Sequence, residues 1–148
     1  MAVSRRRIDI DEGRAALADW LEANKSSDAK TRESADRDPV PRTVIATAVR
    51  YSLEEVTARA PGNSVEVRVP PLGVTQCVEG PRHTRGTPPN VIECDAATWL
   101  AMVTGQLSWE NAVANGSVAA SGLRADLSAL LPLWAFGRGS QCELNGLR

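Results

Sequence analysis

The sequence predicts an α+β fold: a mainly antiparallel sheet of about five strands, covered by helices, with a helical N-terminal extension. Residues 64–69 alternate valine with polar residues, the period of a strand with one buried face. Residues 42–60 carry apolar side chains at spacings of three and four, the period of an amphipathic helix. Residues 95–131 then combine short helical patterns, glycine breaks and a small-residue strand. These observations indicate helices packed on a sheet of short strands.

The first 40 residues are predicted to form one helix and a flexible linker. Asp11 can cap a helix that runs to about residue 24, with Leu17, Trp20 and Leu21 as its apolar face. Residues 25–39 are polar and bury too little apolar surface to offset their ordering entropy. Three arginines at 5–7 suggest either a nucleic-acid or membrane arm or a solvated terminus, and the net charge of −1 favours the terminus.

Residues 41–135 are predicted to contain the sheet, within a single domain overall. Its long helix carries one apolar stripe, formed by Ile45, Val49, Leu53, Val56 and Ala60. Strands are expected at residues 64–69, 74–79, 91–94 and 118–121, with the first two joined by a proline turn. A fifth strand is expected in the tail after Trp134, and the conformation of residues 136–148 is left open.

Residues 95–131 carry the start and stop signals of three helices. Asp95 and Ser108 can each cap a helix, and glycines at 105 and 116 end these helices. In the second helix, Trp109 and Val113 are expected to share one face. Leucines from residue 123 onward return to helical spacing, which predicts a third helix over 124–131 that ends before a proline.

The residues at 68–73 (RVPPLG) and 76–91 (QCVEGPRHTRGTPPNV) resemble the bacterial sterol-carrier-protein orthologue family. The resemblance covers roughly the last two thirds of the chain. It implies a sterol-carrier-like fold, in which helices over one face of a curved sheet leave an apolar tunnel for fatty acyl chains or sterols. The family supplies no catalytic residues to transfer, so a non-catalytic protein is expected.

The loop at residues 80–90 contains Arg82, His83 and Arg85 between glycines and prolines. Arginine suits carboxylates and phosphates, and histidine titrates near neutrality, so the three residues form a candidate site for an anionic headgroup. The alternative is that they brace the loop by hydrogen-bonding its carbonyl groups.

The three cysteines, Cys77, Cys94 and Cys142, are scattered, which is typical of reduced thiols in a cytoplasmic protein. Cys77 and His83 could act as a nucleophile and base, but a strand cysteine usually behaves as a small buried hydrophobe. No metal-ligand spacing joins the cysteines to the histidine, so neither a metal nor a cofactor is expected. No apolar run is long enough to span a bilayer.

An apolar set in the C-terminal half either lines a ligand cavity or fills the core. The candidate cavity residues are Trp99, Leu100, Val103, Trp109, Val113, Leu127 and Leu131, with Leu130 and Trp134 beside them. The resulting hypothesis is binding or carriage of a hydrophobic small molecule, such as a fatty acyl, isoprenoid or sterol-like lipid. The alternative is a protein-interaction or enzyme-accessory domain without a lipid cavity. Related domains accompany thiol-dependent maleylpyruvate isomerases, but this chain has one histidine and lacks their histidine-rich helical module.

Overall fold

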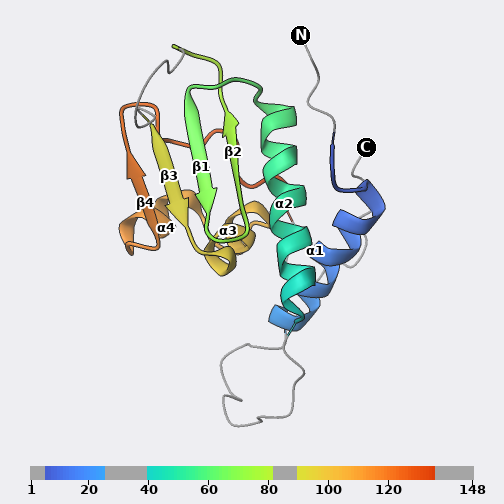
Figure 1. The fold of residues 1–148 in the computed structure, drawn as a ribbon. Coiled ribbons are helices and arrows are strands. Elements are labelled where there is room, and N and C mark those ends of the chain that lie inside the picture. The colour runs from blue at the N-terminus through green and yellow to red at the C-terminus, as the bar shows by residue number, and fades with distance from the viewer. Residues whose placement is uncertain (1–5, 26–39, 82–89, 136–148) are drawn as a thin grey trace.

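The computed structural model describes residues 6–25, 40–81 and 90–135 (Figure 1). Helices and strands follow one another in the order α1 (Ile10–Lys25), α2 (Arg42–Arg59), β1 (Val65–Val69), β2 (Gly73–Cys77), β3 (Val91–Cys94), α3 (Ala96–Val103), α4 (Trp109–Ala114) and β4 (Val118–Ser121). The α+β class is therefore confirmed.

Four strands form one mixed sheet in the order β2-β1-β3-β4. The outer pairs, β1 with β2 and β3 with β4, are antiparallel, whereas the central pair β1 and β3 is parallel. The antiparallel hairpin of β1 and β2 follows the prediction, with Val65 opposite Cys77. The predicted fifth strand falls on residues 136–148, which lie outside the described residues.

Helices α3 and α4 lie behind the sheet, α2 lies alongside β2 at its edge, and α1 lies beyond α2 (Figure 1). The three valines of β1 are buried as predicted. Asp95 caps α3 by accepting from the Thr98 N–H at 2.7 Å, and Ser108 caps α4 by accepting from the Asn111 N–H at 3.1 Å. Both predicted caps are confirmed.

Helix α2 is buried on two sides, although the sequence indicated one apolar stripe. Val49, Leu53 and Val56 of the predicted stripe are buried. Ala48 and Tyr51 are also buried, on the side of the helix that faces α1. Helix α2 therefore needs α1 on one side and the sheet and α3 on the other.

The indole of Trp99 joins α3 to α2 inside the core. Its Nε1–H donates to the hydroxyl of Ser52 at 2.8 Å, and both residues are fully buried. The same hydroxyl donates to backbone carbonyls one turn earlier in α2. A polar pair in the core is thus completely hydrogen-bonded, as buried polar groups require.

Helix α1 begins two residues earlier than predicted, and its cap is Asp9 instead of Asp11. The Asp9 carboxylate accepts from the N–H groups of Asp11 and Glu12 at 3.0 and 3.2 Å. Gly13 brings α1 close to α2, because an added Cβ would lie 2.2 Å from the ring of Tyr51. The predicted apolar face of α1 is buried.

A group of stacked aromatic and arginine side chains, which we call the arginine clamp, holds the N-terminal arm on α2. The rings of Tyr51 and Trp134 stack 5.6 Å apart at 7°. The guanidinium of Arg6 lies over Tyr51, and that of Arg59 lies over Trp134. Glu55 pairs with both arginines. The clamp therefore joins the N-terminal arm, α2 and the segment before residue 136.

Two local predictions were wrong for backbone reasons. Residues 124–131 form turns instead of a helix, because the Asp126 carboxylate accepts from the Ser128 N–H at 2.8 Å and competes with helical bonding. Strand β2 stops at Cys77, before the predicted residue 79. There Val78 adopts a φ of 63°, and its N–H donates to the Ala60 carbonyl at 2.7 Å, which turns the chain out of the ladder.

We predict that Ser52→Ala lowers the free energy of unfolding by about 1–3 kcal/mol, because it leaves the Trp99 N–H buried without an acceptor. Chemical denaturation of both proteins measures the difference. The matched control is Thr47→Ala, which removes a similar hydroxyl from a partly exposed position of the same helix. Equal losses in the two variants would contradict a special role for the buried pair.

We predict that Glu55→Gln lowers the free energy of unfolding by about 1–3 kcal/mol at pH 7. Burial raises the pKa of Glu55, but hydrogen bonds from Arg6 and Arg59 outweigh it, so this pKa lies below its ordinary 4.5. A lowered carboxyl pKa stabilises the fold above the unfolded-state pKa and loses this effect as pH falls through the folded-state pKa.

The difference between wild type and Glu55→Gln should therefore shrink as pH falls below 4.5, which urea unfolding at several pH values measures. Glu93→Gln, at an exposed position of β3, is the control. A difference independent of pH would show that the Glu55 charge does not hold the clamp.

Candidate functional site

The predicted cavity residues of α3 form the centre of the core. Trp99, Leu100 and Val103 have no accessible surface, and Leu127 has 1%. A side chain lining a void that admits water would retain accessible surface, so protein atoms surround these residues closely. The structure thus brings this part of the predicted set together as a packed cluster.

The remaining members of the apolar set do not share one environment. Trp109 is buried, whereas Val113, one turn later in α4, is 41% exposed. The small Ala112 takes the inward position in α4 instead. Leu130 and Leu131 are partly buried against the core, and Trp134 belongs to the arginine clamp.

Arg82, His83 and Arg85 lie outside the described residues, but both ends of their loop are placed. Asn90 follows the loop and is buried. Its amide Nδ2–H donates to the Ser64 carbonyl at 2.8 Å, and its Oδ1 accepts from the Arg124 N–H at 2.9 Å. The described residues on either side of 82–89 lie where β2 stops and β3 begins, and the anion site remains a prediction.

Cys77 and Cys94 are buried in the sheet, which is unfavourable for nucleophilic chemistry. Burial raises the pKa of the Cys77 thiol to about 11. Burial, followed by the charges of Asp95 and Glu93, raises the pKa of Cys94 to about 12. Because the thiolate is the nucleophile, these pKa values oppose covalent catalysis at neutral pH. The other proposed partners, His83 and Cys142, lie outside the described residues.

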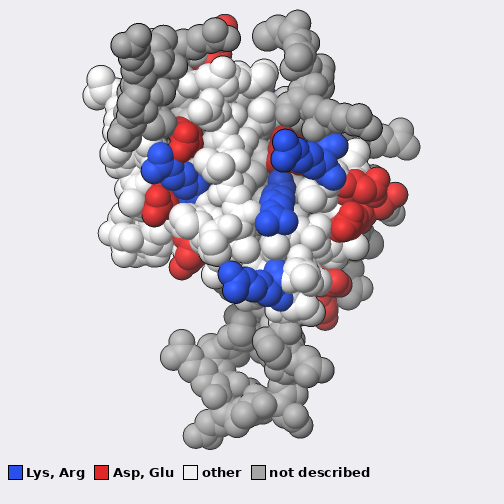
Figure 2. All heavy atoms as spheres, in the orientation of Figure 1, with Lys and Arg blue, Asp and Glu red and all other residues white. Residues whose placement is uncertain are grey.

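The open face of the sheet is mixed in character. Figure 2, in the orientation of Figure 1, shows acidic and basic side chains next to one another with uncharged surface between them. Glu66 and Arg68 of β1 pair with each other, and Val74 of β2 is 60% exposed. The described residues of this face therefore form no single-sign patch of the kind that attracts nucleic acid.

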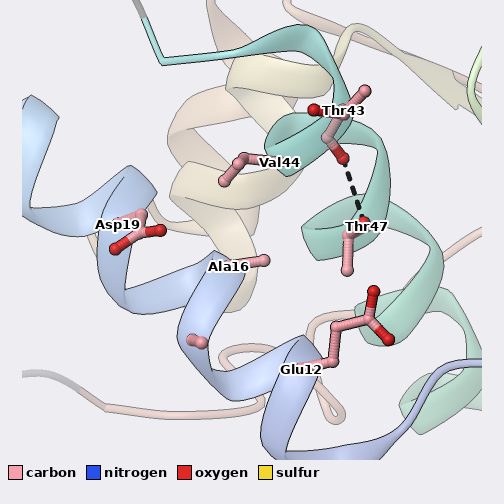
Figure 3. A pocket seen from close by; sticks show the side chains of 7 residues that line it. Glu12, Ala16, Asp19, Thr43, Val44 and Thr47 are labelled. Carbon is pink, nitrogen blue, oxygen red and sulfur yellow. Dashed lines mark hydrogen bonds between the residues drawn. The ribbon is translucent and has the colours of Figure 1, made fainter.

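A groove between α1 and α2 was not predicted from the sequence. It has a volume of about 280 Å³. Its walls are formed by Glu12, Ala15, Ala16, Asp19, Thr43, Val44 and Thr47 (Figure 3). The sequence did contain a signal for this groove: two adjacent alanines in α1 and two threonines four residues apart in α2. Small side chains on facing helices leave space between them. None of the predicted site residues lines this groove.

The described ranges contain neither a cluster of metal-ligating side chains nor a membrane-spanning helix. Across residues 6–25, 40–81 and 90–135, no group of three histidine, cysteine, aspartate or glutamate side chains could hold a metal ion. No helix in those ranges is both long and apolar enough to cross a membrane.

We predict that Cys77 and Cys94 resist iodoacetamide in the native protein. With a pKa of about 11, roughly one Cys77 thiol in a thousand is ionised at pH 8. A Cys142→Ser variant isolates the two buried thiols, and mass spectrometry counts the adducts. Unfolding in urea should make both react fully. Rapid modification of native Cys77 would contradict this environment and revive the nucleophile hypothesis.

Comparison with known proteins identifies the fold family. The family described as bacterial SCP ortholog matches residues 41–133, which is more than half of the chain and includes every described element except α1. No curated protein matches the sequence. The matched span contains the resembling motifs at 68–73 and 76–91, together with the four-stranded sheet and helices α2 to α4. The chain therefore belongs to the family of bacterial SCP orthologues.

Proposed function

We propose that this protein binds or carries a hydrophobic small molecule without catalysing a reaction on it. The observation that carries the proposal is the family match over residues 41–133, which contain the whole described sheet and the helices on it. The ligand class we propose is a fatty acyl, isoprenoid or sterol-like lipid. The high pKa values of the two buried thiols support a non-catalytic role, because they disfavour a thiolate nucleophile.

The proposed apolar site lies between the sheet and α3, around Trp99, Leu100 and Val103. Because these side chains are fully buried, a ligand must separate them from their neighbours to enter. Leu131 is partly buried and Val113 is 41% exposed, so entry beside either residue would disturb fewer buried contacts. In this proposal Arg82, His83 and Arg85 hold an anionic headgroup at the sheet end.

Native mass spectrometry of freshly purified protein, followed by organic extraction, tests the proposal. We expect a discrete mass excess that extraction removes and that proves to be an acyl or isoprenoid lipid. The extracted protein should then take up a fluorescent fatty acid. An unliganded mass together with no uptake would overturn the proposed function.

Substitutions separate the two parts of the proposed site. Arg85→Ala should weaken binding of the fluorescent fatty acid by about tenfold or more, because a hydrogen bond to a charged group contributes about 1.5–3 kcal/mol. The matched control is Arg42→Ala, at an exposed position at the start of α2. If Arg85→Ala binds normally while Trp99→Ala does not, the headgroup site is wrong and the apolar site stands.

A protein-interaction or enzyme-accessory domain is the second candidate. The observation that favours it is the tight packing around Trp99 and Leu100, together with exposed Val74 on the open sheet face. In that case the fold would present a surface and enclose no ligand. An interaction domain should lose partner binding on Val74→Lys while remaining folded, whereas a lipid carrier should keep its ligand.

A further inference from the structure

The groove between α1 and α2 has the shape of a slot along the two helices. On α1 its walls run from Glu12 to Asp19, seven residues that rise about 10 Å along a helix. Ala16 lies between these two side chains along α1, and Val44 and Thr47 come from α2 on the other side (Figure 3). A slot of this form suits a linear chain better than a ring system.

The apolar part of the lining consists of short side chains. It is formed by Ala16, which is buried, Val44, which is half-buried, and Ala15, which is exposed. The hydroxyl of Thr47 donates to the carbonyl of Thr43 at 2.9 Å, so the helix already satisfies this donor. The volume of about 280 Å³ is close to the lower end of small-molecule sites, about 300–1,000 Å³. Burial of an alkyl chain is therefore the main attraction that the slot offers.

The two charges at the slot are both negative. Glu12 and Asp19 stand toward its two ends, and among the residues that the structure describes no basic side chain lines it. An anionic headgroup would be repelled there, whereas an ammonium group at either end of a chain would meet a carboxylate. The charge at this slot is opposite to that of Arg82, His83 and Arg85, so the two sites would select different ligands.

We propose that the slot between α1 and α2 binds a linear aliphatic amine, with its chain on the alanines and its ammonium group beside Glu12 or Asp19. A diamine spanning about 10 Å would reach both carboxylates. The inference goes beyond the proposed function, because one wall of the slot is α1, which lies outside residues 41–133 of the family match. Its residues differ from those of the proposed lipid site.

Titration of the full-length, ¹⁵N-labelled protein with 1,8-diaminooctane tests the proposal. We expect amide shifts at residues 12–19 and 43–47, and no shifts there from octanoate. Glu12→Gln and Asp19→Asn should each weaken diamine binding about two- to fivefold, the range of an exposed ion pair. Octylamine should bind more weakly than the diamine, because it meets one carboxylate instead of two.

Two tryptophan substitutions supply the matched comparison. Ala15→Trp should fill the slot and abolish the diamine shifts, whereas Ala23→Trp, at an exposed position of α1 outside the slot, should leave them unchanged. Circular dichroism checks that both variants keep their helices. The inference would be overturned by equal responses to octanoate and the diamine, or by no shifts with any amine. It would also be overturned by shifts centred on residues 99–103, or by full binding by Ala15→Trp. Lipid uptake by the wild type would stand in every one of these cases.

Discussion

The burial of α2 on two sides is the constraint on which the rest of the structure depends. One side packs on β2 and α3 through Val49, Leu53 and Val56, and the other carries Ala48 and Tyr51 toward α1. A helix that is apolar on two sides is stable only between two partners. Residues 41–133 supply the sheet and α3, and α1 supplies the other partner from outside the family match.

The arginine clamp shows how three distant segments are held at one end of α2. Charges near a protein interior are favourable only when they are paired and hydrogen-bonded, and Glu55 pairs both Arg6 and Arg59. The aromatic faces of Tyr51 and Trp134 give the guanidinium groups a second favourable contact. The stack thus fixes α1 at its N-terminal end, and the groove farther along α1 has small side chains on both walls.

The family fold and the packing of this chain point to different parts of the molecule. The proposed lipid site lies in the space between α3 and the sheet, yet Trp99 there is fully buried and hydrogen-bonded to Ser52. Binding at that proposed site would break core contacts, so ligand entry would require a conformational step. The accessible volume between α1 and α2 needs no such step, and its acidic lining gives it a different preference.

Local patterns in the sequence determined the helices α1 to α4, the caps at Asp95 and Ser108 and the strand β1, because periodicity and capping depend on neighbouring residues. The PRHTRGTPPN motif also indicated the family. Only the tertiary structure decided the second buried side of α2, the outward position of Val113, and the groove. These features depend on which elements meet in space. For example, Gly13 lets α1 approach Tyr51 of α2 closely, but a glycine in the sequence does not indicate which helix will pack against it.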